Sequence, residues 1–430
     1  MEKNKCYILT NFKMKANLVK FSSTLLYFLP AALISGPLIS DTILSIIALI
    51  FIFLSVKERS WKYYKNNFFY IFSLLYFYIL FRTLLSEDPS LALINSLFYF
   101  RFGIFSLAVW HLIDNNDDLV NNLFFVFSIT LFILIFDALI QIIFGQNLFG
   151  LEMDPGMGWR FTGLFGDEGI LGSYLSKILP LYFALMLFNN TGRRFLNYIF
   201  FIIFVFGFAL IYMSGERTAF FVTSIALIVL LIMLEEKKIK IIFGAFLISA
   251  ILLIVGSSIM NKDFKTHMID HTLEQMGAVD QNFKFFSRTH ESHYEISIKM
   301  FKDNPIFGKG PKTFRKYCSD EKFKVEFEGS CSTHPHNYYI QMLAETGLIG
   351  FGFLLLAFFY VCKEYFVHKF NSLFHKKKYL SDCEILLLSC FFISLWPLAP
   401  SGNIFNNWLS IIMYLPLGFY LRKKFTKTQI

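Results

Sequence analysis

Residues 122–144 read NLFFVFSITLFILIFDALIQIIF, a run in which Asp137 is the only ionisable side chain. A helix needs about 20 predominantly apolar residues to cross a hydrocarbon layer about 30 Å thick. This run therefore predicts one membrane-spanning helix. Similar apolar runs recur along the rest of the chain.

The composition of the whole chain agrees with a membrane protein. Of its 430 residues, 55% are hydrophobic and 17% are charged, with a mean hydropathy of +0.53, whereas soluble domains carry about 25% charged residues. The predicted fold class is therefore all-α, a polytopic membrane protein of about 12 transmembrane helices. The spans are expected near 21–36, 38–56, 68–86, 91–113, 122–144, 169–188, 195–213, 217–234, 241–259, 338–362, 382–399 and 404–421.

Lysine and arginine are distributed unevenly between the predicted loops. With the N-terminus inside, the inner segments hold 23 of them, and the short outer loops hold only Arg160 and Arg217. The positive-inside rule then predicts that both termini are cytoplasmic. This topology accounts for the net charge of +9, so nucleic acid is not expected as a partner. The first 20 residues are basic and no A-x-A-like site follows, so we expect the first apolar segment to remain as a span.

One hydrophilic stretch, residues 260–337, separates the ninth and tenth predicted spans. It divides the chain into an N-terminal membrane bundle at 1–259, this loop at 260–337 and C-terminal helices at 338–430. The predicted topology places the loop outside the cytoplasm. Within it, residues 287–303 align Tyr294, Ile298 and Phe301 as one apolar stripe, which predicts a helix on the membrane surface.

Two of the six cysteines, Cys318 and Cys331, lie in this loop. Outside the cytoplasm they can form a disulfide, and two unrelated thiols are the alternative. The cysteines and histidines do not have zinc-type spacing, and no Asp-x-Asp motif is present. We therefore predict neither a metal nor a cofactor.

Four ionisable residues from distant parts of the sequence fall on the predicted outer face. Arg160 precedes the sixth span, Arg217 lies in a short break between two spans, Arg288 opens the predicted surface helix, and His336 ends the loop. Arginine stays charged and matches phosphate oxygens with a planar fork. Histidine accepts a proton near neutral pH. Together they are suited to holding a lipid diphosphate and activating a hydroxyl.

Each of these residues also has a plainer interpretation. Arg217 can be a snorkelling helix end, Glu168 suits the positive end of a helix, and Glu345 can be a paired carboxylate at the membrane boundary. Three further histidines of the loop compete with His336 for a chemical role: His290, His293 and His334.

Three stretches make the chain resemble the O-antigen ligase and O-antigen polymerase superfamily, the bacterial membrane glycosyltransferases that use undecaprenyl-diphosphate-linked glycans. They are Arg160–Glu168 with Leu171–Tyr174, Ser214–Thr218, and a third set comprising Arg288, Asp303–Pro311, Phe314, His334–Asn337 and Glu345–Gly350. The order, spacing and membrane placement of these stretches agree with the family across most of the chain.

The resemblance implies about twelve spans with a large periplasmic loop, and inverting transfer without a metal. His336 matches the family's histidine at the end of the loop, the general base that deprotonates the acceptor hydroxyl. Arg217 and Arg288 match the arginines that hold the diphosphate. The substrate-binding residues expected on the same basis are Arg160, Glu168, Asn337 and Glu345.

The sequence therefore predicts a glycosyltransferase of the bacterial inner membrane. We expect it to transfer a glycan from undecaprenyl diphosphate to an acceptor hydroxyl at the periplasmic face. The acceptor is lipid A-core in a ligase and a second carrier-linked repeat unit in a polymerase, and the residues do not distinguish the two. A lipid-linked glycan flippase is the alternative from another class, and a structural assembly subunit is a third reading.

Overall fold

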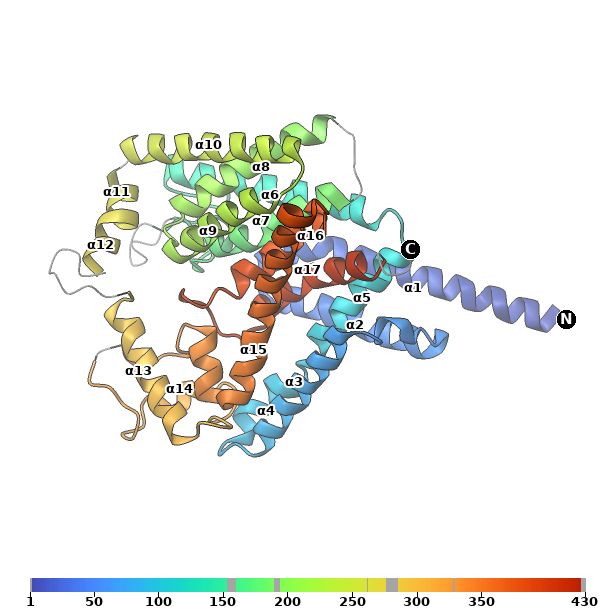
Figure 1. Cartoon of the computed structure of the whole chain (residues 1–430), viewed down its shortest axis with the longest axis horizontal. Coiled ribbons are helices and arrows are strands. Elements are labelled where there is room, and N and C mark those ends of the chain that lie inside the picture. Colours follow the sequence, from blue (N-terminus) through green and yellow to red (C-terminus); the bar gives the residue numbers. More distant parts are fainter. Residues whose placement is uncertain are drawn as a thin grey trace.

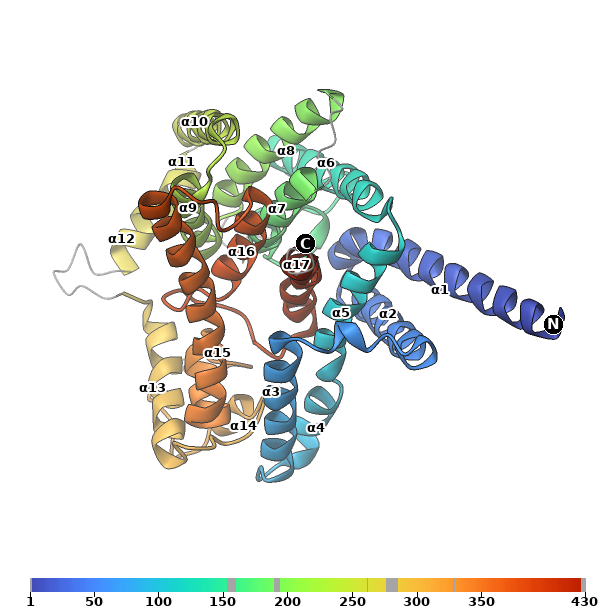
Figure 2. The same cartoon turned by 45° about the vertical axis from the view of Figure 1, so that its right-hand side comes forward.

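The computed structural model describes residues 2–152, 160–188, 194–260, 262–275, 285–327 and 329–426. These residues are folded into helices and connecting loops, and they contain no β-strand (Figure 1). The prediction of an all-helical fold is confirmed. The N-terminal end of the first helix projects from the bundle in both views (Figure 1 and Figure 2).

The longer helices form the bundle. They are α1 (Glu2–Ser35), α2 (Pro37–Glu58), α3 (Asn67–Leu84), α4 (Pro89–Leu97), α5 (Phe100–Asn115), α6 (Leu119–Phe144), α7 (Leu171–Phe188), α8 (Arg194–Met213), α9 (Arg217–Met233), α10 (Lys237–Met260), α15 (Tyr338–Phe370), α16 (Asp382–Ser394) and α17 (Asn407–Thr426). The hydrophilic loop and the short connections contribute η1 (Trp61–Tyr63), η3 (Gly163–Phe165), α11 (Lys262–Lys265), η4 (Thr266–Asp270), α12 (His271–Gln275), α13 (Arg288–Asp303), α14 (Phe314–Tyr317) and η5 (Asn371–His375).

Eight helical segments of the described chain are long and apolar enough to cross a membrane. They are Lys13–Ser35, Pro37–Glu58, Asn67–Leu84, Pro89–Asn115, Leu119–Phe144, Leu171–Phe188, Lys237–Ile259 and Tyr338–His375. Two shorter apolar helices, Ile202–Met213 and Arg217–Met233, coincide with two further predicted spans. The chain is thus a polytopic helical membrane protein, and the number of twelve spans stays a prediction.

The C-terminal pair of predicted spans differs from two plain helices. Helix α16 has 13 residues, a length of about 20 Å, and all of them are buried. A stretch without regular structure, residues 395–406, joins it to α17. Irregular backbone at membrane depth requires polar partners from the protein. Asn337 supplies two of them, because its side-chain amide donates to the carbonyls of Pro397 (2.9 Å) and Ala399 (3.2 Å).

Helix α13 confirms the predicted helix but buries a different face. Its start is capped by Ser287, whose hydroxyl accepts a hydrogen bond from the His290 amide. The predicted stripe of Tyr294, Ile298 and Phe301 is only half-buried. The buried residues are Ser292, His293, Ile296, Ser297 and Met300. The face packed against the protein thus includes two serines, which apolar periodicity does not register. The placement of the apolar stripe on a membrane surface stays a prediction.

The loop helices α13 and α14 dock beside α15 (Figure 1 and Figure 2). Gly347 makes this possible, because it interrupts α15 with φ 64° and ψ −165°. A Cβ atom at Gly347 would overlap the carbonyl oxygen of Ile306, and one at Gly308 would overlap the backbone of Glu345. The turn at Gly308 and the kink of α15 at Gly347 can therefore pack against each other only because both residues lack a side chain.

Cys318 and Cys331 form a disulfide with their Cα atoms 5.0 Å apart. The sulfur of Cys318 also lies 3.7 Å from the carbonyl oxygen of Ser332. The bridge therefore fixes the segment that leads into His336 against α14.

Replacing Gly347 by alanine should destabilise the protein by about 2–4 kcal/mol, because the new methyl group would meet both a positive φ and a backbone clash. Gly352→Ala is the matched control on the same helix, since a Cβ there meets no atom within 4 Å. Thermal unfolding in detergent should show a lower midpoint for Gly347→Ala and an unchanged or higher one for Gly352→Ala. Equal midpoints for the two variants would contradict the docking described here.

Candidate active site

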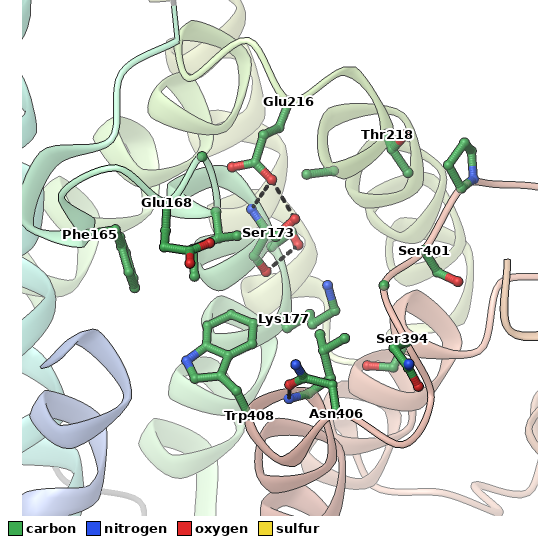
Figure 3. A pocket seen from close by; sticks show the side chains of 18 of the residues that line it. Phe165, Glu168, Ser173, Lys177, Glu216, Thr218, Ser394, Ser401, Asn406 and Trp408 are labelled. Carbon is green, nitrogen blue, oxygen red and sulfur yellow. Dashed lines mark hydrogen bonds between the residues drawn. The ribbon is translucent and has the colours of Figure 1, made fainter. Parts of the chain in front are cut away.

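A cavity of about 970 Å³ opens at one end of the bundle. Five connections between helices form its walls, and each contributes a residue that faces it: Gly36, Glu168, Glu216, His336 and Ser401. Figure 3 shows part of this lining. We refer to this part of the molecule as the loop-rich end. The connections that form it are those that the charge pattern places on the outer side.

His336 lies in the wall of the cavity and has an uncommon backbone conformation. Its φ is 55°, a region that non-glycine residues seldom adopt. The surrounding structure holds it there, since its carbonyl accepts a 2.8 Å hydrogen bond from the Ser401 amide. The Ser332 hydroxyl lies 3.3 Å from its Nε2 atom. The ring is thus fixed from both the disulfide-bonded loop and the α16–α17 connection.

Three other imidazoles surround His336. Its ring centroid lies 4.1 Å from that of His334, 5.3 Å from His293 and 5.6 Å from His290. Burial, followed by the charge of these three rings, lowers the pKa of His336 from 6.5 to about 3. At neutral pH the His336 ring is therefore uncharged and can accept a proton.

Arg160 directly precedes a segment that residues at and after the end of α6 hold in place. Gln141 accepts hydrogen bonds from the amides of Thr162 (3.1 Å) and Gly163 (2.8 Å). The Asn147 side chain donates to the Gly163 carbonyl at 3.0 Å. Among the residues that the structure describes, the buried Nε atom of Arg160 has no hydrogen-bond partner. A fixed loop thus presents a guanidinium that is not fully satisfied.

Arg160 and Arg217 meet at the turn between α8 and α9. A Cβ atom on Gly215 would lie 3.2 Å from the side chains of both Arg160 and His267. Arg217 donates to the Thr272 hydroxyl at 3.2 Å. Burial lowers the pKa of His267, and Arg217 and Arg160 add to this effect. We call Arg160 and Arg217 the arginine pair.

His290 links the arginine pair to the histidines around His336. Burial, His293 and then the charge of Arg217 lower its pKa to about 4. Two fixed positive charges therefore lie on one side of a group of neutral imidazoles. This arrangement can attract an anion without protonating the histidines.

Arg288 is exposed, and its guanidinium lies 5.5 Å from the ring centroid of Phe327. The described residues that line the cavity include neither Arg288 nor the arginine pair. The structure thus brings Arg160 and Arg217 together and holds Arg288 elsewhere on the loop, two residues before His290.

Glu345 and Asn337 are buried residues that organise the backbone. The Glu345 carboxylate accepts hydrogen bonds from the amides of Lys312 (2.9 Å) and Phe314 (3.0 Å) and from Gln341 (3.0 Å). Asn337 caps α15 by accepting from the amides of Tyr339 and Ile340. Neither side chain lines the cavity among the residues described there.

Glu168 and Glu216 line the cavity beside the start of α7 (Figure 3). Glu168 is exposed to it. Glu216 accepts hydrogen bonds from the Gly172 amide (2.5 Å), the Ser173 amide (3.0 Å) and the Ser173 hydroxyl. Burial raises the pKa of Glu216, although these bonds and the charge of Lys177 oppose the effect. Lys177 itself also lines the cavity.

Two residues of this region escaped the sequence analysis. Lys177 is the only charged residue of α7, and a lone charge inside an apolar span is the signal that could have marked it. His267 follows α10 in a stretch without a recognisable motif, so no local pattern points to it.

Part of the chain matches a known protein family. Residues 202–355 match the family model described as O-antigen ligase, and no curated protein matches the chain significantly. The matched range holds the α8–α9 turn, the hydrophilic loop and the first half of α15. The resemblance of this chain to the O-antigen ligase and polymerase superfamily is therefore confirmed, over the residues that carry Arg217, Arg288 and His336.

Proposed function

We propose that the protein is an inverting glycosyltransferase of the bacterial inner membrane, which transfers a glycan from undecaprenyl diphosphate to an acceptor hydroxyl. The O-antigen ligase match supports a membrane enzyme of surface polysaccharide synthesis. The observation that carries the finer proposal is the neutral His336 in a cavity wall, with the arginine pair beyond His290.

In this proposal, the acceptor oxygen attacks the anomeric carbon of the glycan while its proton passes to an unprotonated ring nitrogen of His336. The bond between that carbon and the diphosphate oxygen breaks, and undecaprenyl diphosphate leaves. Arg217 and Arg160 neutralise the charge that grows on the leaving group. Their fixed positive charge takes the part that a metal ion plays elsewhere, so the proposed reaction is metal-independent.

The remaining predicted site residues have supporting roles in this scheme. Asn337 and Glu345 are positioning residues, because one holds the α16–α17 connection and the other the loop at Lys312–Phe314. Glu168 faces the cavity, where its carboxylate can accept hydrogen bonds from sugar hydroxyls. Arg288 guides the anionic carrier toward the arginine pair from the exposed part of the loop.

Two features support a periplasmic active face with both termini in the cytoplasm. The positively charged short connections alternate along the chain with the connections that form the cavity, as the positive-inside rule requires. The Cys318–Cys331 disulfide lies at the loop-rich end, and such bonds persist in oxidising compartments such as the periplasm. Lipid A-core and a second carrier-linked repeat unit are the two acceptors to distinguish.

His336→Ala should lower transfer by about 10²–10⁴-fold, the usual contribution of a general base. The assay is the glycan profile of a deletion strain that expresses each variant. Long polymer left on the carrier would identify the lost step as ligation to lipid A-core, and single repeat units would identify it as polymerisation. His375→Gln is the control, since His375 is exposed in η5 at the other end of the molecule.

A wild-type profile in cells that express His336→Ala would contradict the proposal. If the carrier-linked glycan instead stays on the cytoplasmic side of the membrane in that strain, the lost activity is flipping, and the transporter alternative gains support.

The pH dependence of transfer should reflect the lowered pKa of His336. A general base is active when unprotonated, so activity falls only as the pH drops through its pKa. With a value of about 3, kcat/KM should change less than about twofold between pH 7.5 and pH 5. A histidine at its ordinary pKa of about 6.5 would instead lose roughly tenfold per unit below that pH. Such a loss, with unfolding temperatures unchanged over the same range, would contradict the neutral histidine group.

A further inference from the structure

Lys177 places a positive charge inside the cavity. It belongs to α7, which otherwise carries no charged residue. Figure 3 shows its ammonium group pointing into the space between Ser173, Ser394 and Ser401. A charge within a membrane helix is costly and usually serves binding or catalysis. Lys177 takes no part in the proposed transfer step.

The ammonium of Lys177 is only partly compensated by its surroundings. Burial disfavours its charged form, and the charge of Glu216 opposes this effect. That carboxylate, however, already accepts three hydrogen bonds from Gly172 and Ser173 at the start of α7. The ammonium therefore keeps donor capacity that faces the cavity, since a lysine has three N–H donors.

Cations outnumber carboxylates along the described lining. The cationic lining residues are Lys177, Lys312 and Arg315, and the carboxylates are Glu168 and Glu216. With three cations against two carboxylates, the described lining as a whole favours an anionic occupant.

The wall around Lys177 suits a sugar. Trp408 is fixed by a 2.8 Å hydrogen bond from its indole to the Leu33 carbonyl, so its ring offers a rigid apolar surface. Ser173, Ser176 and Asn406 add hydroxyl and amide groups close by. Rigid aromatic surface with a few placed polar groups is the usual composition of a small-molecule site.

The charge of Lys177 is also separate from the arginine pair. Arg160 and Arg217 lie across the Ser214–Glu216 turn and do not line the cavity among the residues described. A diphosphate held by the arginine pair would therefore leave Lys177 free for a second anionic group. An acidic sugar is the part of a glycan that supplies such a group.

We propose that Lys177 binds the carboxylate of an acidic sugar in the cavity and makes the protein selective for anionic glycans. This inference deepens the proposed function and rests on it for the identity of the ligand as a glycan. Lys177 is then a specificity residue.

Binding of glucuronic acid and glucose to the purified full-length protein in nanodiscs tests this inference without any transfer step. Saturation-transfer NMR suits the weak affinities expected of single sugars. Wild-type protein should bind glucuronate about tenfold more tightly than glucose, as one charged hydrogen bond provides. Lys177→Met should bind both sugars equally and glucose as the wild type does, whereas Lys177→Arg should retain the preference.

Three results with the two sugars would overturn the proposal, and the first needs no variant. They are equal binding of the two sugars by wild-type protein, a preference that survives in Lys177→Met, and a preference that disappears in Arg217→Met instead. Farnesyl diphosphate is the probe for the other anionic ligand that Lys177 could bind, the diphosphate of the lipid carrier. If its affinity falls in Lys177→Met as much as in Arg217→Met, Lys177 belongs to the diphosphate site and the proposal fails. If the protein binds glucuronate selectively but has no transfer activity, the proposed function is contradicted. The proposed sugar-binding role of Lys177 would still hold.

Discussion

The loop-rich end depends on the need of buried backbone groups for partners inside a membrane protein. Residues 395–406 are irregular, and they are held by polar groups at the start of α15. Asn337 binds the carbonyls of Pro397 and Ala399, Gln341 accepts from the Ile404 amide (3.0 Å), and His336 accepts from the Ser401 amide. Because these partners lie next to one another in the sequence, the same contacts that satisfy the backbone also fix His336 in the cavity wall.

Burial at the loop-rich end also determines which side chains near His336 carry a charge. Four imidazoles packed together cannot all carry charge, so burial and mutual repulsion keep them neutral. Arg160 and Arg217 keep their charge under the same conditions, because guanidinium does not deprotonate in proteins. The site thus combines a neutral base with permanent cations. An anionic leaving group and an acceptor hydroxyl need both, and neither alone would support displacement at a sugar carbon.

The sequence was informative where the signals are local. The apolar periodicity of residues 287–303 located α13, and the apolar runs located most of the bundle helices. The buried face of α13 includes two serines, which apolar periodicity does not register. The proximity of Arg160 and Arg217 depends on contacts between distant segments that no local pattern encodes. The same holds for the placement of Lys177 and Glu216 in the lining of one cavity. The interruption between α16 and α17 was hidden for a similar reason, since its partners lie in α15.

The most direct test of the account is the stereochemistry of transfer by purified protein, with undecaprenyl-diphosphate-linked glycan as donor and a chelator present. Direct displacement assisted by His336 predicts release of undecaprenyl diphosphate and a product linkage whose anomeric configuration is opposite to that of the donor. Retention of configuration would require a covalent intermediate and would contradict the single-base mechanism. Loss of transfer on chelation would show that the arginine pair does not supply the positive charge on which the account depends.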